Sequence, residues 1–131
     1  MPMTTPLADR HVERRWTSPD DLSLYARDYA PAEGPARLPV IAIHGLTRNS
    51  ADFGVIAGLI AHSGRRVLAI DVRGRGRSDR APDPMTYTPD VYAKDVVALM
   101  GQAGIEKAVF LGTSMGLSLI HISEPTRPLY I

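Results

Sequence analysis

The sequence has no cysteine, no long apolar run and almost no net charge. Without cysteine the chain can form no disulfide, no thiol nucleophile and no Cys-based zinc site. The net charge of +1 gives no general reason to expect a nucleic-acid or membrane partner, and no apolar run approaches the ~20 residues of a membrane-spanning helix. Residues 1–16 hold no apolar segment of the kind a secretory signal needs. We therefore expect a cytoplasmic protein with no metal, no cofactor, and no nucleic-acid or membrane partner.

The residues that are present suit one globular domain, with 44% hydrophobic and 22% charged residues. Three short apolar runs, at residues 40–43, 67–70 and 108–111, do not alternate with polar residues, which is typical of strands buried on both faces of a parallel sheet. Helical patterns at 49–64 and 88–104 separate these runs. The order strand, helix, strand, helix, strand predicts an α/β fold with right-handed crossovers.

Both predicted helices have recognisable ends and one apolar face. In the first, Asn49 or Ser50 can act as N-cap and Gly64 can end the helix. In the second, Thr88 is the expected N-cap and Gly104 the expected stop. The spacing predicts a buried face in each helix, made of Phe53, Ile56, Ala57 and Ile60 in the first and of Tyr92, Val96, Leu99 and Ala103 in the second.

The chain before the first buried strand has a different pattern. Residues 10–18 and 22–30 alternate roughly every second residue and flank the turn composition SPDD, which predicts an antiparallel hairpin. Residues 1–10 are polar with two prolines, and we expect them to be disordered. Residues 30–39 are rich in Pro, Ala and Gly and are expected to form a loop.

Ligands of open α/β sheets bind beyond the carboxyl ends of the strands, so the residues after each apolar run matter most. The third run is followed by GTSMG, residues 112–116. A G-x-S-x-G match alone can be a simple glycine-flanked turn. Directly after a buried strand, however, it fits a strained strand-to-helix turn that projects a serine hydroxyl. We therefore interpret Ser114 as a nucleophile.

The first run is followed by HGLTRNS, residues 44–50. His44 could be a catalytic base, part of an oxyanion loop, or a buried histidine at a strand end. We disfavour the interpretation of His44 as the catalytic base, because in this fold class the base follows the serine along the chain. Acyl transfer requires two N–H donors aimed at the developing oxyanion, which we assign to Leu46 and Met115. His44 and Gly45 would then shape the loop.

The second run is followed by DVRGRGRSDR, which places four arginines within eight residues, Arg73 to Arg80. One interpretation is a phosphate- or nucleic-acid-binding loop. The spacing fits neither a P-loop nor a full G-x-G-x-x-G, and Asp71 and Asp79 offset part of the charge. We favour a glycine-bent loop with internal Arg–Asp pairing.

Taken in order, the strand-HGLT, strand-DVRGRGRSD and strand-GTSMG segments resemble the α/β-hydrolase superfamily, in its esterase, lactonase and C–C hydrolase branch. The resemblance covers residues 11–116 as the N-terminal part of the fold. It implies a serine nucleophile at Ser114 and an oxyanion hole from Leu46 and Met115. Dehalogenases and epoxide hydrolases of the superfamily carry Asp at the nucleophile position, and Ser114 argues against both.

The residues after the elbow depart from this pattern. In the family, the acid and the histidine follow the nucleophile after long stretches of chain. Here the one histidine after Ser114 is His121, and the one acidic residue after it is Glu124. Leu117 to Arg127, LSLIHISEPTR, resembles the translated adapter of a sequencing library. We therefore expect residues 117–131 to be a non-native tail, and the 131-residue chain, which lacks the acid and histidine, to be inactive.

The sequence thus predicts a hydrolase that cleaves an ester-like carbonyl bond through Ser114 and an acyl-enzyme, with a small-molecule substrate. Two alternatives remain open at this point. One is a non-catalytic α/β-hydrolase-like binding protein, and the other is a phosphate or nucleic-acid binder that uses the Arg73–Arg80 loop.

Overall fold

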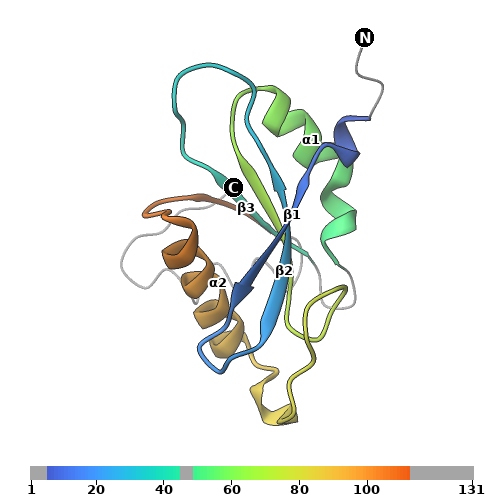
Figure 1. Cartoon of the computed structure of the whole chain (residues 1–131), viewed down its shortest axis with the longest axis vertical. Helices are drawn as coiled ribbons and strands as arrows, with labels where there is room; N and C mark the ends of the chain where they lie inside the picture. Colours follow the sequence, from blue (N-terminus) through green and yellow to red (C-terminus); the bar gives the residue numbers. More distant parts are fainter. Residues whose placement is uncertain (1–5, 45–48, 113–131) are drawn as a thin grey trace.

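The computed structural model describes residues 6–44 and 49–112, which form a five-stranded mixed sheet with a helix on each face (Figure 1). The strand order is β1-β2-β4-β3-β5. The strands are β1 (Val12–Thr17), β2 (Ser23–Tyr29), β3 (Val40–Ile43), β4 (Val67–Asp71) and β5 (Val109–Gly112).

The N-terminal hairpin is confirmed. Strand β1 pairs antiparallel with β2, in a register that sets Trp16 opposite Leu24. Strand β2 in turn pairs antiparallel with β4, with Tyr25 opposite Asp71. Ser18 closes the turn of the hairpin, because its hydroxyl accepts a hydrogen bond from the Leu22 N–H at 2.8 Å.

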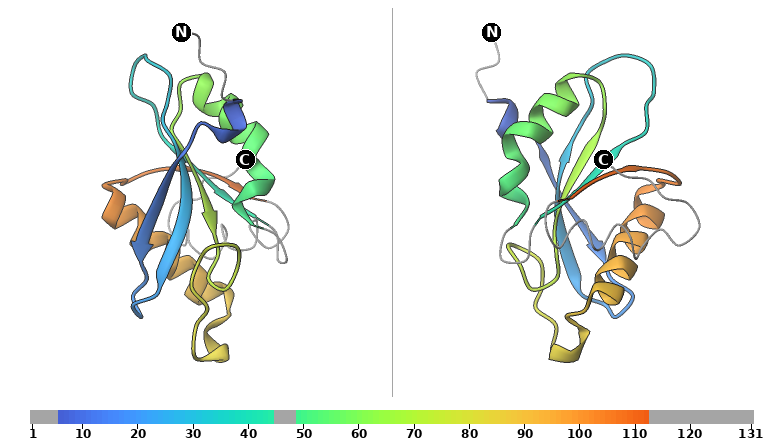
Figure 2. Two further views of the ribbon diagram at one scale, coloured as in Figure 1. Left: turned by 45° about the vertical axis from the view of Figure 1, so that its right-hand side comes forward. Right: turned by 180° about the vertical axis from the view of Figure 1, so that it is seen from behind.

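The three apolar runs form the parallel part of the sheet, as the sequence predicts. Strand β3 lies between β4 and β5, and every residue of β3 and β4 is buried. Alternate residues of these strands face two separate hydrophobic clusters, one under α1 (Gly54–His62) and one under α2 (Pro89–Ala103). Figure 2 shows the two helices on opposite sides of the sheet.

Helix α2 has the predicted ends. The Thr88 hydroxyl accepts from the Val91 N–H, and Gly104 ends the helix in the left-handed region at φ 71°. The indole N–H of Trp16 in β1 donates to the Asp95 carbonyl at 2.8 Å, which joins the hairpin to this helix. Tyr92, Val96 and Leu99 are buried as predicted, and Ala103 is half-buried.

Helix α1 differs from the prediction at its start and on its face. Asn49 does cap, but it caps a short 3-10 helix, η2 (Ser50–Phe53), that precedes α1. Ile56 is 46% exposed, so the predicted apolar stripe is wrong there. The buried face of α1 consists of small residues, namely Gly54, Ala57, Gly58 and Ala61.

The small face lets α1 pack closely against the N-terminal segment. Residues Leu7–Asp9 form a 3-10 helix, η1, whose Leu7 backbone lies so near Gly58 that an added Cβ would sit 2.6 Å from it. The expected disorder of residues 1–10 is therefore corrected for Leu7–Asp9, while residues 1–5 lie outside the described part of the chain.

Candidate active site at the carboxyl edge of the sheet

The carboxyl ends of the three parallel strands meet at one edge of the sheet. Ile43, the last residue of β3, is paired with Ile70 in β4 and with Gly112 in β5. The chain that leads to Gly45 and Leu46 therefore leaves the sheet beside the chain that leads to Ser114. The structure thus brings together the starting points of the segments in which the sequence predicts chemistry.

Four of the five predicted site residues lie outside the described residues. These are Gly45, Leu46, Ser114 and Met115. Their roles as loop-shaping residue, oxyanion donors and nucleophile stay predictions.

His44, the fifth, is fully buried directly after β3. Its Nε2 accepts a hydrogen bond from the Val72 backbone N–H at 3.0 Å. A backbone N–H can only donate, so Nε2 is the unprotonated nitrogen and its lone pair is occupied. His44 is therefore not placed to take a proton from a nucleophile, and it joins the end of β3 to the end of β4.

Asp71, the last residue of β4, is a site residue that the sequence analysis did not identify. There it was expected only to offset part of the charge of the neighbouring arginines. Its side chain is buried, and it accepts hydrogen bonds from the Ser50 N–H at 2.6 Å and the Arg77 N–H at 2.9 Å. The signal in the sequence was an aspartate at a strand end followed by two glycines. Gly74 and Gly76 both have positive φ, which turns the chain back over the carboxylate.

Arg73 shows what the arginine-rich segment does. Its guanidinium is fully buried, with Nε 2.7 Å from Asp95 Oδ2 and with two further bonds to Asp20, at 2.8 and 2.9 Å. The predicted glycine-bent loop with a paired arginine is thus right, but the carboxylate partners of Arg73 do not come from the loop itself. They come from α2 and from the β1–β2 turn, because a buried guanidinium needs carboxylates on the elements that enclose it.

The three charges of this cluster influence one another. The hydrogen bond from Arg73 lowers the pKa of the Asp20 carboxyl well below its usual range. Burial raises the pKa of Asp95, and the hydrogen bond from Arg73 opposes that effect. The hydrogen bond to Asp95 raises the pKa of Arg73, so Arg73 stays charged.

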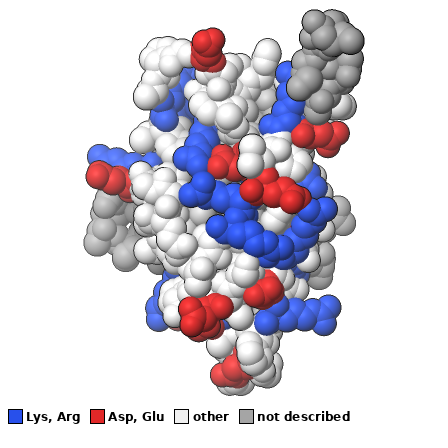
Figure 3. Space-filling model, viewed as in Figure 1, with Lys and Arg blue, Asp and Glu red and all other residues white. Residues whose placement is uncertain are grey.

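A second cluster lies on the hairpin beside the arginine-rich segment. The guanidiniums of Arg15 and Arg77 lie 5.5 and 5.4 Å from the centre of the Tyr25 ring, and Arg77 pairs with Glu13. Figure 3 shows basic side chains gathered across the middle of this view, with acidic ones among them. Burial is the main cause that raises the pKa of Tyr25, and the hydrogen bond to Glu13 adds to it.

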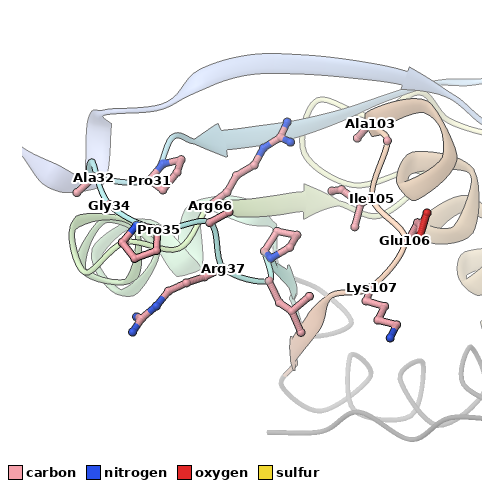
Figure 4. A pocket seen from close by; sticks show the side chains of 15 residues that line it. Pro31, Ala32, Gly34, Pro35, Arg37, Arg66, Ala103, Ile105, Glu106 and Lys107 are labelled. Atoms are coloured by element: carbon pink, nitrogen blue, oxygen red, sulfur yellow. The ribbon is translucent and has the colours of Figure 1, made fainter.

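The opposite edge of the sheet carries a groove of about 660 Å³ (Figure 4). Loop residues 31–39 line one side of it and residues 103–107 line the other. Strands β3, β4 and β5 begin here, at Val40, Val67 and Val109. The groove is therefore at the wrong end of the strands for the predicted chemistry, and we place the candidate site at the carboxyl edge despite the size of this groove.

Within residues 6–44 and 49–112, no group of three or more His, Asp or Glu side chains is arranged to hold a metal ion. No helix in the same part of the chain has the length and apolarity needed to span a membrane.

A mixed sheet with two parallel crossovers, one helix on each face and motif-bearing segments at its carboxyl edge defines an α/β-hydrolase-like class of protein. Residues 39–117 match the alpha/beta hydrolase fold family, and the chain belongs to that family.

Its relatives include proteins with different names. A crystal structure of an alpha/beta hydrolase from Novosphingobium aromaticivorans is 44% identical with a TM-score of 0.82, over 88% of this chain and 39% of that one. An sn-1-specific diacylglycerol lipase of Danio rerio is 40% identical over 69% of this chain and 28% of its own length. A non-heme chloroperoxidase of Streptomyces lividans is 36% identical over 76% of this chain and 34% of its own. The chain thus spans well under half the length of each.

Proposed function

We propose that this chain is the N-terminal part of a serine hydrolase that cleaves ester-like carbonyl bonds of small molecules. Ser114 is the nucleophile, the N–H groups of Leu46 and Met115 form the oxyanion hole, and His44 and Gly45 shape the loop that carries Leu46. The reaction needs no metal and no cofactor, and the protein is cytoplasmic. We call the longer protein the complete hydrolase.

The pairing of Ile43 with Gly112 supports this proposal most directly. Ser114 follows Gly112 by two residues, and Leu46 follows Ile43 by three. A nucleophile and an oxyanion donor must both reach one carbonyl group, and segments that start side by side can bring them to it. Family membership adds weight, and the zebrafish relative is itself named a lipase.

The proposed reaction proceeds in two steps. Ser114 Oγ attacks the carbonyl carbon while a general base accepts its proton, and collapse of the tetrahedral intermediate expels the alcohol to leave an acyl-enzyme. Water then adds to the acyl carbonyl, the acid is released and the serine regains its proton. In both steps, the two N–H donors stabilise the oxyanion.

The test is a Ser114→Ala variant of the complete hydrolase, assayed on short activated esters. We expect kcat/KM to fall by at least about a thousandfold, since loss of the nucleophile in a serine protease costs on the order of a millionfold in kcat. Ser63→Ala, which removes an exposed hydroxyl at the end of α1, is the matched control and should leave kcat/KM unchanged. Activity of Ser114→Ala within tenfold of wild type would remove Ser114 from the mechanism.

A non-catalytic binding protein is the alternative, and the same assay separates the two. A complete protein that shows no turnover while it binds an ester without chemical change would favour the binding function. The 131-residue chain is expected to give no turnover by itself, because only His121 and Glu124 follow Ser114 as possible base and acid.

A further inference from the structure

Both ends of the segment between β3 and η2 are held by two consecutive residues at the end of β4. His44, where the chain leaves β3, accepts from the Val72 N–H at 3.0 Å. Ser50, where the chain enters η2, donates its N–H to Asp71 Oδ1 at 2.6 Å. The point of departure and the point of return are therefore fixed by one short stretch of backbone and one carboxylate.

The Asp71 carboxylate is itself held from the other side. Its Oδ2 accepts from the Arg77 N–H at 2.9 Å. Gly76, at φ 50°, passes so near that an added Cβ would sit 2.2 Å from Oδ2. Hydrogen bonds to an ionised acceptor are about twice as strong as neutral ones, so the buried carboxylate has little freedom to move.

Ser78 completes the frame around Asp71. Its hydroxyl donates to the Asp71 carbonyl at 2.6 Å and accepts from the Tyr25 N–H at 2.8 Å. Strand β2 is thereby joined to the same residue. Gly76 and the Arg77 N–H thus confine the Asp71 carboxylate that accepts from Ser50, and Ser78 holds the Asp71 backbone.

This frame is more than the local fold requires. A strand end can satisfy its backbone groups with solvent or a neutral side chain, whereas a buried carboxylate carries a desolvation cost. An oxyanion donor, by contrast, must lie within a few tenths of an ångström of its position, since about 1 Å of misplacement can cost about a hundredfold in rate. A rigid anchor is useful for that purpose.

We propose that Asp71 is a positioning residue for ester hydrolysis, with His44 as the matching anchor at the other end of the segment. The inference rests on the proposed function, since the segment so anchored carries Leu46. Asp71 acts through the Ser50 N–H and does not touch the substrate.

The experiment compares Asp71→Asn with Asp79→Asn in the complete hydrolase. Asp79 is the matched control because it lies in the same loop, is exposed, and also accepts a backbone N–H, that of Ser23 at 2.8 Å. An asparagine at position 71 can accept from only one of its two N–H donors and turns its own NH₂ toward the other. The measured quantities are KM, and kcat per active site titrated with a fluorophosphonate.

We expect Asp71→Asn to lower kcat per titrated site about ten- to hundredfold with KM changed less than threefold, and to weaken binding of a boronic acid by a similar factor. Asp79→Asn should change none of these by more than about twofold. A purely structural role would reduce the titrated fraction but leave kcat per site intact, and that result would overturn the inference.

Two further variants keep the inference testable if Asp71→Asn yields no titratable sites. His44→Gln supplies an amide oxygen that can accept from Val72, and His44→Leu does not. We expect kcat per site to fall in both variants and to fall further in His44→Leu, which leaves the Val72 N–H without an acceptor, and equal values in both would overturn the inference. Failure of the proposed function itself is distinguishable, because Ser114→Ala would then remain active.

Discussion

Arg73 joins three separate elements of the described structure. Its side chain is fully buried, yet it reaches the β1–β2 turn through Asp20 and α2 through Asp95. Both carboxylates are engaged in bidentate fashion, a geometry that the planar guanidinium provides and lysine does not. Arg73 thus joins the hairpin, the β4 loop and α2 at one point.

We predict that Arg73→Met costs about 3–5 kcal/mol of stability at pH 7, because it leaves the buried Asp95 carboxylate without its partner. The measurement is urea denaturation of the complete hydrolase. Arg77→Met is the control from the same loop. Its side chain is 62% exposed, so loss of its pair with Glu13 should cost no more than about 1 kcal/mol.

The pH dependence of the Arg73→Met defect follows from the two carboxylates. In the wild type, the lowered pKa of Asp20 adds stability that is present above its ordinary value of 3.8 and lost as the pH falls through the lowered pKa. In the variant, burial of Asp95 acts unopposed and raises its pKa further, so the group becomes neutral as the pH falls. The Asp95 effect makes the defect largest near neutral pH and smaller toward pH 4, and the Asp20 effect reduces it further only below pH 3.8. A defect that grows on acidification would contradict this assignment.

At the scale of elements, α1 and α2 meet their neighbours in different ways. Helix α2 buries large side chains, whereas α1 buries glycine and alanine so that η1 and the sheet can come close. The consequence is that Val55, Ile56 and Leu59 remain exposed on α1. A glycine in α1 is therefore a packing residue, whereas Gly101 in α2 has open space beside it.

We predict that Gly58→Ala displaces η1, because its Cβ would meet the Leu7 backbone at 2.6 Å. Amide exchange should report this first at Arg10, whose N–H donates to the Leu7 carbonyl at 3.2 Å. Gly101→Ala is the matched control and should stabilise the protein by about 0.5–1 kcal/mol, as alanine does in a helix interior. Equal stabilisation by both substitutions, with unchanged exchange at Arg10, would show that the close approach is not energetically important.

These differences explain how much of the fold could be read from the sequence. The three buried strands, the hairpin and both ends of α2 were predictable because apolar runs, alternation and capping residues are local signals. The buried face of α1 was predicted correctly at Ala57 but not at Gly54, Gly58 and Ala61, since periodicity highlights large apolar residues and misses a face made of small ones.

The site was predictable to a lesser degree. The positions after β3 and β5 follow from a general rule about parallel sheets, and that rule led to His44. The role of Asp71 depends on Ser50, 21 residues earlier in the chain, and the partners of Arg73 lie 53 and 22 residues away. Such contacts arise only when the elements are packed, so no local pattern reports them.

At the scale of the whole molecule, the described residues form a sheet whose three parallel strands, β3, β4 and β5, each lead into a motif-bearing segment at one edge. Strand β3 has β4 on one side and β5 on the other, so the ends of all three parallel strands contribute to the same region. The frame around Asp71 and the Arg73 cluster stand on the β4 side of that region. We propose that Ser114 acts from the β5 side.

The most direct test is to identify the residue that becomes covalently modified. The complete hydrolase is treated with a fluorophosphonate, digested and mapped by mass spectrometry, with heat-unfolded protein as the control for non-specific labelling. We predict one phosphonyl adduct, on Ser114, formed by the native protein and not by the unfolded one, because only an activated serine hydroxyl reacts. An adduct on a different residue, or none on Ser114 in a protein that still hydrolyses esters, would contradict the account.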